Sequence, residues 1–396
     1  MPAETDAPAQ PSGVRPVTLP ELFLAFLRLG ATAFGGPAIV AYIRDLAVNR
    51  RGWLDDKSFR SGVALCQSIP GATAMQTAAY VGLRARGVLG GLATYIGFGL
   101  PAFLLMLLFS VLYQRSHDLP MVLSLFRGLR AIVIALVANA AVTFGWSTLR
   151  KAREVVVAGL AAAALAFQAN PILVIVAAGL AGVLLLPAGA DPGGDRNAHA
   201  PRRGWVPGLL LVLLAAVAVG ALFLTDRRLF ELAATMLRID LFAFGGGFAS
   251  LPIMQHEVVN ARQWLDARAF IDGVALGQVT PGPLVITATF VGYHVRALPG
   301  AVVGTISVFT PSFVLLVLTL PAFDRLQASP LFRKAVRGAL LAFIGLLVSV
   351  AVRFGIAVAW TLPLALLGLA AFTALRLKVD MLWVVLVGGI LSVLLG

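Results

Sequence analysis

The sequence has little charge and almost no cysteine. Only 12% of its 396 residues are charged, whereas 59% are hydrophobic and the mean hydropathy is +0.92. Soluble domains carry about 25% charged residues, so a soluble core could not hide this much apolar surface. Cys66 is the single cysteine, which excludes an intrachain disulfide and a cysteine-rich metal site. The composition predicts an integral membrane protein and excludes a nucleic-acid-binding domain, although the net charge is +13.

Sequence motifs of enzymes are also missing. The four histidines are scattered, without the His-x-x-x-His spacing of a zinc site. The sequence contains no Walker-type phosphate loop and no nucleophile elbow. We therefore expect no enzyme activity, no metal and no cofactor.

Long apolar runs separated by short basic clusters fill most of the chain. A helix that crosses a bilayer needs about 20 apolar residues. We expect an all-α, multi-pass membrane protein with roughly thirteen apolar segments, some of them crossing only half of the membrane. The predicted parts are a disordered tail (1–17), a first transmembrane domain (18–187), a linker with one transmembrane helix (188–228) and a second transmembrane domain (229–396).

The two predicted transmembrane domains repeat the same motifs in the same order. The sequence FGGP at 34–37 recurs as FGGG at 244–247, and GVALCQSIPG at 62–71 recurs as GVALGQVTPG at 273–282. A Trp-Leu-Asp turn lies between the two motifs in each copy. Because an odd number of expected spans separates the copies, we predict two homologous helical domains in an inverted repeat, as in many secondary transporters.

Each copy interrupts its helices twice, with a glycine run and with a Gln-x-x-Pro-Gly sequence. Inside a bilayer, non-helical backbone survives only where it lines a cavity or is buried in protein. A helix that restarts there presents its N-terminal amides to an anion. Close helix packing for the glycines and simple kinks for the prolines are the alternatives. We predict a substrate site made by both copies, from Gly35, Gly36, Pro37, Gln67, Pro70, Gly71, Gly245, Gly246, Gly247, Gln278, Pro281, Gly282 and Pro283.

Charged residues lie near these helix breaks. Arg28 and Arg238 each lie six positions before the phenylalanine that opens the glycine motif. An arginine within an apolar stretch indicates function by default, although its side chain can instead reach the membrane surface. We include both arginines among the substrate-binding candidates. Among the few nearby carboxylates, which include Asp240, we select Asp45 and Glu257 as proton-coupling candidates, with the holding of an arginine as the alternative role.

These motifs resemble those of the chromate transporter family in its long, two-domain form. The resemblance is carried by FGGPAIVAYIRD, ALCQSIPGATAMQ and GFGLPAF in the first half, and by FGGGFASLPIMQHEVV, GVALGQVTPGP and FTPSF in the second. It implies a carrier in the bacterial inner (plasma) membrane that exports chromate, is driven by the proton motive force and gives chromate resistance. It also implies that sulfate competes as an analogue.

The chain departs from the family pattern at two places. Ala72 stands where many members have a proline after Pro-Gly, and Ile39 and Val40 stand where relatives often have a polar residue. The residues leave a sulfate or related oxyanion carrier, including an importer, and an oxyanion channel as alternatives. The expected partners are a chromate-like or sulfate-like oxyanion and the lipid bilayer, without nucleic acid, and both a monomer and a homodimer fit the sequence.

Overall fold

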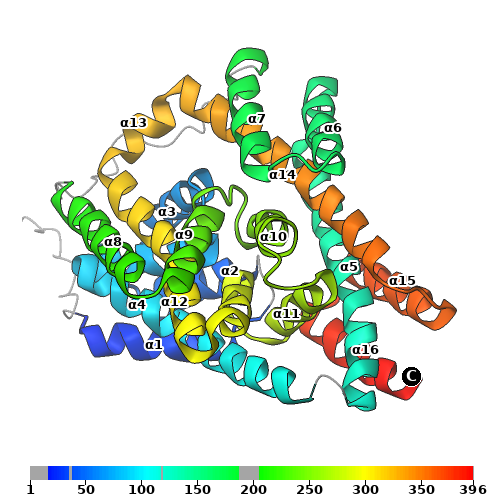
Figure 1. Ribbon diagram of the computed structural model, residues 1–396. Helices are drawn as coiled ribbons and strands as arrows, with labels where there is room; N and C mark the ends of the chain where they lie inside the picture. Colours follow the sequence, from blue (N-terminus) through cyan, green and yellow to red (C-terminus); the bar gives the residue numbers. More distant parts are fainter. Residues whose placement is uncertain (1–16, 35–37, 117–118, 187–204, 396) are drawn as a thin grey trace, which may run out of the picture.

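The computed structural model describes residues 17–34, 38–116, 119–186 and 205–395, and these residues form helices and turns without any strand (Figure 1). The predicted all-α class is therefore confirmed. Residues 1–16 of the predicted tail, residues 188–204 of the predicted linker, and Gly35, Gly36 and Pro37 lie outside the described residues. The α-helices are α1 (Leu19–Thr32), α2 (Ala38–Arg44), α3 (Asp56–Ser68), α4 (Thr73–Ser116), α5 (Pro120–Thr148), α6 (Ala152–Ala166), α7 (Pro171–Leu185), α8 (Val206–Thr225), α9 (Arg227–Leu241), α10 (Gly247–Gln255), α11 (Ala267–Val279), α12 (Thr287–Thr319), α13 (Phe323–Ala328), α14 (Pro330–Ala357), α15 (Leu362–Arg376) and α16 (Met381–Leu395). Short π-helical turns occupy Asp45–Arg50 and His256–Ala261, and 3-10 turns occupy Leu284–Ile286 and Leu320–Ala322.

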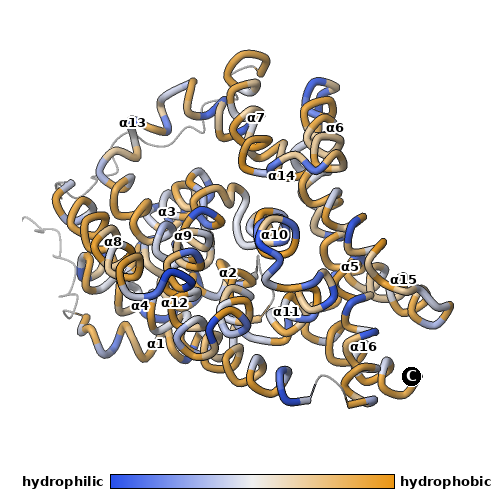
Figure 2. The backbone as a smooth tube through the Cα atoms, viewed as in Figure 1, coloured by the Kyte–Doolittle hydropathy of each residue, from blue (hydrophilic) through white to orange (hydrophobic). Residues whose placement is uncertain are grey.

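Five of the described helices are long and apolar enough to cross a membrane, namely α4, α5, α8, α12 with its preceding and following turns, and α14. Helix α8 shows why a bilayer is needed: only Gly208 is buried along its 20 residues, while leucines such as Leu209 and Leu213 are exposed. A helix that exposes apolar side chains all round is stable in lipid and not in water. Figure 2 accordingly shows α8 almost entirely in the colour of hydrophobic residues.

Helices α4 and α12 each contain a sharp reversal that divides them into two legs. Helical geometry fails at Arg86 and Gly87 in α4, and at Arg296 and Ala297 in α12. The legs then pack tightly, since a Cβ built on Gly82 would lie 2.1 Å from the carbonyl oxygen of Gly90. Glycine permits this close approach of two backbones because it has no side chain.

The first leg of α4 returns along α3, so these two segments form a helical hairpin. The Tyr80 hydroxyl donates to the carbonyl oxygen of Ser58 at 3.1 Å, and the Tyr80 ring lies against Gly62. The helix interruption predicted at the Gln-x-x-Pro-Gly sequence is confirmed here. Helix α3 ends at Ser68 and α4 begins at Thr73, because Pro70 has no amide hydrogen with which to continue the helical ladder.

The second repeat builds the same hairpin from α11 and the first leg of α12, in which Gly273 lies against the ring of Phe290. The remaining helices exchange partners between repeats. Helix α5 of the first repeat packs on α15 and α16 of the second, while α14 of the second packs on α6 and α7 of the first. The two repeats are therefore intertwined, and neither buries its helices alone.

Helix caps set where α3 and α11 begin. The carboxylate of Asp55 accepts the Ser58 amide at 2.8 Å, and that of Asp266 accepts the Ala269 amide at 2.7 Å. Both aspartates belong to the repeated Trp-Leu-Asp turn, so the two copies begin these helices in the same way. These hydrogen bonds satisfy amides that have no partner in the first turn of a helix.

Candidate functional site

The helix breaks of the two repeats meet and form reciprocal hydrogen bonds. The Gly71 amide, in the first repeat, donates to the Ala243 carbonyl oxygen at 3.0 Å in the second. The Gly282 amide, in the second repeat, donates to the Ala33 carbonyl oxygen at 2.9 Å in the first. Each Pro-Gly loop thus satisfies the end of the helix that precedes a glycine run in the other repeat. Four chain segments that are far apart in the sequence converge here.

The glycine run of the second repeat is a helix break, as predicted. Helix α9 ends at Leu241, α10 begins at Gly247, and the intervening Gly245 and Gly246 have φ of +106° and +88°. Residues other than glycine rarely adopt such backbone angles. A Cβ built on Gly246 would lie 3.2 Å from the hydroxyl of Thr73, so this break faces the start of α4.

Gly247 lies on the other side of this break, toward the second Pro-Gly loop. A Cβ built on Gly247 would lie 3.5 Å from side-chain atoms of Leu284 and Val285, which follow Pro283. Helix α10, near the centre of Figure 1, packs against α9 and α14. The glycine break is therefore enclosed by the starts of both returning legs.

Two long helices begin at this cluster of breaks. Helix α4 starts at Thr73, directly after Pro70, Gly71 and Ala72, and α12 starts at Thr287 after a 3-10 turn. The first amides of a helix have no partner within it and carry roughly half a positive charge together. The arrangement can therefore hold an anion between two helix N-termini and the glycine backbone.

The two predicted glutamines differ in their surroundings. The Gln278 side chain is buried, and its Nε2 atom has no hydrogen-bond partner among the described residues. Gln67, at the equivalent position, is exposed. Gln76, which the sequence reasoning did not select, is fully buried and donates through Nε2 to the Pro70 carbonyl oxygen at 2.8 Å. A buried amide donor without a partner is costly unless a ligand uses it.

The predicted charged residues are only partly brought together. Arg238 and Glu257 approach to 3.4 Å, and Arg262 lies 3.5 Å from the same carboxylate, which links α9 to the π-helical turn after α10. Arg28 is exposed. Asp45 forms an exposed pair with Arg50 at 2.6 Å within its own turn.

The sequence did not predict a buried chain of hydrogen bonds that begins at the carboxylate of Asp240. Asp240 is fully buried, and its Oδ2 atom accepts from the Ser312 hydroxyl at 2.7 Å and from the Ser312 amide at 2.8 Å. The Ser312 hydroxyl oxygen in turn accepts from the Ala72 amide at 2.8 Å. A comparison of the two copies could have indicated this contact. Asp240 and Ser312 correspond to Gly30 and Ala102 in the first copy, so both polar residues of the contact are present in the second copy alone.

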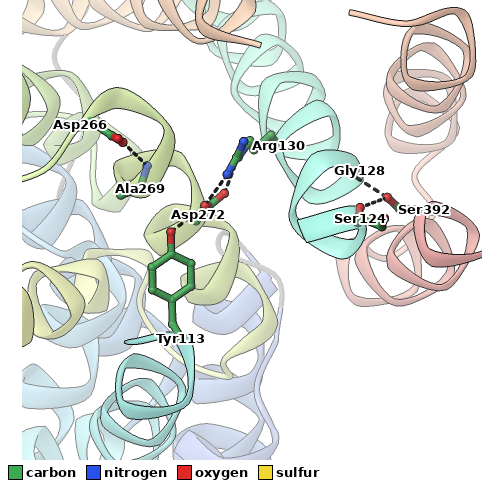
Figure 3. Close-up of polar contacts among 8 residues, drawn as sticks. All are labelled: Tyr113, Ser124, Gly128, Arg130, Asp266, Ala269, Asp272 and Ser392. Atoms are coloured by element: carbon green, nitrogen blue, oxygen red, sulfur yellow. Dashed lines mark hydrogen bonds and ion pairs between the residues drawn. The ribbon is translucent and has the colours of Figure 1, made fainter. Parts of the chain in front are cut away.

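A second buried carboxylate joins the repeats away from the breaks (Figure 3). Asp272 of α11 is 1% exposed and accepts two hydrogen bonds from Arg130 of α5, at 2.6 and 2.7 Å. The Tyr113 hydroxyl adds a third at 2.9 Å. Nearby, the Ser392 hydroxyl connects α16 to Ser124 and Gly128 of α5. These contacts fix α11, which carries Gln278, against the first repeat.

One cavity of about 750 Å³ lies between α4, α8, α9 and α12. Its walls are apolar side chains such as Leu211, Leu237 and Phe313. The hydroxyls of Tyr95, Thr305 and Thr310 in its lining donate to backbone carbonyl oxygens. An oxyanion there would lie mainly against apolar groups, and burying a charge in this way is very costly. The convergent helix breaks, and not this cavity, are therefore the candidate anion site.

Comparison with known proteins identifies the family. The family model described as "Chromate transporter" matches twice, over residues 20–183 and 230–393. The chain is 40% identical over 376 residues to an uncharacterized transporter of Methanocaldococcus jannaschii, covering 94% of each chain. It is 34% identical over 330 residues to the chromate transport protein of Pseudomonas aeruginosa, covering 79% of this chain and 74% of that one. It is 30% identical over 381 residues to the chromate transport protein of Cupriavidus metallidurans, covering 96% of this chain and 92% of that one. No solved structure matches the chain.

Proposed function

The chain belongs to the chromate transporter family, and from this premise we propose that it is a secondary active carrier that exports chromate across the bacterial inner membrane. The proton motive force drives the export, and the cell gains chromate resistance. The family and the apolar helices make the chain a multi-pass membrane protein. The two reciprocal hydrogen bonds between helix breaks carry the proposal, because they enclose two helix N-termini inside the protein.

In this proposal the oxyanion binds where the breaks converge. The amides that open α4 and α12, with the backbone of the second glycine run, replace the water of a small dianion. The binding set is the one predicted from the sequence, with the free Nε2 donor of Gln278 directed to an oxyanion oxygen. Gly35, Gly36 and Pro37 belong to the proposal by repeat equivalence, since they lie outside the described residues. Arg238, held by Glu257, adds positive charge beside the site, and Arg28 does so in the first repeat.

The contacts also support an inverted relation between the repeats. Helix α3 and the first leg of α4 form a hairpin, so the pair enters and leaves the membrane on the same side. In this proposal α6 with α7, and α9 with α10, each enter and leave the membrane on one side. Three long apolar segments then change side between the hairpins of the two repeats: the second leg of α4, α5 and α8. An odd number of crossings places the hairpins of the second repeat on the opposite side. Hairpins that enter from both sides meet at their tips, which accounts for the reciprocal hydrogen bonds.

The membrane potential favours this direction of transport. A charge that moves through a potential of 100 mV changes its free energy by about 2.3 kcal/mol. An outward-moving dianion therefore gains about twice this amount when the interior is negative. The voltage component of the proton motive force is sufficient to drive export in this scheme.

The test is chromate flux in proteoliposomes under an imposed membrane potential. We expect flux to follow the potential, to be inhibited by sulfate and to be stimulated by chromate on the opposite side. Arg238→Ala and Gln278→Ala should abolish flux in a protein that still folds, whereas Gln327→Ala on α13, outside the cluster of breaks, should leave it intact.

Each part of the proposal has its own contrary result. Absence of chromate flux at every potential would exclude the carrier. Flux without stimulation from the opposite side would indicate a channel, and sulfate transported in preference to chromate would indicate a sulfate carrier. Normal flux in both the Arg238 and Gln278 variants would remove these residues from the site.

A further inference from the structure

Asp240 is a carboxylate in the interior of the protein without a charged partner among the described residues. It is fully buried in α9, its Oδ2 atom is bound by Ser312, and its Oδ1 atom has no hydrogen-bond partner. A buried carboxylate without a counter-charge tends to bind a proton. A protonated carboxyl group has one oxygen that accepts hydrogen bonds and one oxygen that carries the proton. In Asp240, Oδ2 accepts from Ser312 and Oδ1 is free to carry the proton.

The surroundings of Asp240 contain few other ionisable groups. From α4, Tyr95 faces the carboxylate and donates its hydroxyl to the Phe309 carbonyl oxygen at 2.7 Å. Helices α8 and α10, which also pack on α9, contain no ionisable residue. Helix α12, which packs on α9 as well, has Tyr293, His294 and Arg296 at its reversal, where Arg296 pairs with Asp226 before the start of α9. Arg238 of α9 itself is directed to Glu257. A change of charge at Asp240 is therefore not compensated by its neighbours.

The carboxylate is inserted into a turn of α12 that proline has opened. Pro311 cannot donate to the helical ladder, and two groups of this turn bind side chains outside it. The Phe309 carbonyl oxygen accepts from Tyr95, and the Ser312 amide donates to Asp240. Asp240 is thus held at a defined place and reaches the helix break through the Ser312 hydroxyl.

This hydrogen-bond chain ends at the proposed oxyanion site. The Ser312 hydroxyl accepts the amide of Ala72, the residue before the start of α4, at 2.8 Å. Thr73, the next residue, faces Gly246. The positive N-terminus of α4 attracts the oxyanion, and a negative charge on Asp240 would offset this attraction. Two negative charges near one helix end also repel each other, so an ionised Asp240 weakens oxyanion binding.

This chain of hydrogen bonds exists in one repeat only. At the equivalent positions of the other repeat, Pro283 has no amide hydrogen, Ala102 has no hydroxyl and Gly30 has no carboxylate. Gly282 there lies against the methyl group of Ala102, at 3.1 Å from a built Cβ. The backbone amide of Ala72 can donate to Ser312 because this protein has alanine, and not proline, at that position.

We propose that Asp240 is the proton-binding site of this carrier, and that its protonation allows the α4 helix end at Ala72 and Thr73 to bind the oxyanion. The proposal rests on the proposed function of the breaks as the oxyanion site. The reaction is reversible protonation of the Asp240 carboxylate, and no bond other than the O–H bond forms or breaks. Proton and oxyanion then bind with mutual support and move together. Outward movement of the proton is opposed by the proton concentration gradient, so the membrane potential, acting on the net charge of −1, is the component that drives export of the pair.

The test measures the binding of radiolabelled chromate by the purified full-length protein between pH 5.5 and 8.5. In the wild-type protein, the dissociation constant should rise by up to tenfold per pH unit in the upper part of this range, because binding requires one proton. Asp240→Asn keeps an oxygen acceptor for Ser312 but cannot ionise, so it should bind at all pH values as the wild-type protein does at low pH. Protonation of chromate itself affects both proteins equally, so their ratio isolates Asp240.

Two controls and a second readout complete the experiment. Asp266→Asn makes the same change at an exposed helix cap and should retain the wild-type pH dependence. Glu257→Gln tests the other candidate and should also retain it. A pH-indicator dye in weak buffer should report proton uptake when chromate binds the wild-type protein and none when it binds Asp240→Asn.

The contrary results are specific. The same pH dependence and proton uptake in folded Asp240→Asn would overturn the proposal, and loss of both in Glu257→Gln would transfer the role to Glu257. Should Asp240→Asn not fold, Ser312→Ala carries the test: it removes a donor to the charged carboxylate and should move the pH midpoint of binding upward, and an unmoved midpoint counts against Asp240. Failure of the wild-type protein to bind chromate at any pH would instead refute the proposed function, and this inference with it.

Discussion

Replacement of Arg130 by methionine tests the buried contact that joins α11 to the first repeat. Asp272 is 1% exposed and has two hydrogen bonds from Arg130 and one from Tyr113. In Arg130→Met the aliphatic part of the side chain is kept, but the carboxylate loses its counter-charge and two of its three donors. The Tyr113 hydroxyl alone cannot replace them.

The size of the effect follows from burial and distance. Two unit charges about 4 Å apart interact by about 4 kcal/mol at an effective dielectric constant of 20. Removing one member of a buried ion pair typically costs about 3–5 kcal/mol, because the remaining charge is left uncompensated. We expect Arg130→Met to lower the free energy of unfolding by this amount. Arg130→Met combined with Asp272→Leu should recover most of it, since the buried charge is then gone.

The measurement is unfolding in mixed detergent micelles with increasing denaturing detergent, followed by loss of helical circular dichroism. Arg127→Met is the matched control, because Arg127 lies one turn earlier on α5 and is exposed. Its effect should stay within about 0.5 kcal/mol. A loss in Arg130→Met no greater than in Arg127→Met, or a double variant less stable than the single one, would refute the assignment of a stabilising buried pair.

Two predictions concern backbone positions. Gly71→Ala should lower stability by about 3 kcal/mol or more and abolish transport, since φ is +120° and the added Cβ would lie 2.2 Å from the Ser312 hydroxyl; Gly52→Ala, with φ of +59° and no neighbour within 4 Å, should cost only about 1 kcal/mol. Equal melting temperatures of these two variants would contradict the packing of the Pro-Gly loop. Ala297→Gly should stabilise the protein by about 1 kcal/mol, because Ala297 has φ of +46° at the reversal of α12, where the other repeat has Gly87. A lower melting temperature in this variant would show that Ala297 is not strained.

Several features of the fold could be predicted from local sequence. Pro70 and Pro281 end helices because they lack an amide hydrogen, and the glycines at 245 and 246 adopt positive φ that other residues avoid. Asp55 and Asp266 cap helices through bonds to residues three positions away. Hydropathy alone did not show that the chain turns back after Pro70, because an apolar segment has the same composition whether it crosses the membrane or turns back.

The contacts of the candidate site depend on residues far apart in the chain. Asp240 and Ser312 are 72 positions apart, and Ala72 and Ser312 are 240 apart. Nothing in the neighbourhood of Asp240 distinguishes it from Asp45, which the sequence favoured and which pairs with its own turn at an exposed place. Asp240 differs from Asp45 because it is buried and has no charged partner among the described residues. Both differences come from the packing of distant segments.

The sequence by itself determined that the chain is an integral membrane protein and a tandem repeat. It also determined that helices are interrupted at the glycine and proline motifs. These properties follow from composition and from backbone chemistry that acts within a few residues. Only the tertiary structure decided that the breaks of one repeat bind the helix ends of the other. It also decided that Gln278 and Asp240 are buried, while Gln67 is exposed and Asp45 is only partly buried. Equivalent motifs acquire different surroundings because each is completed by the opposite repeat, and the two repeats differ in the residues that they contribute.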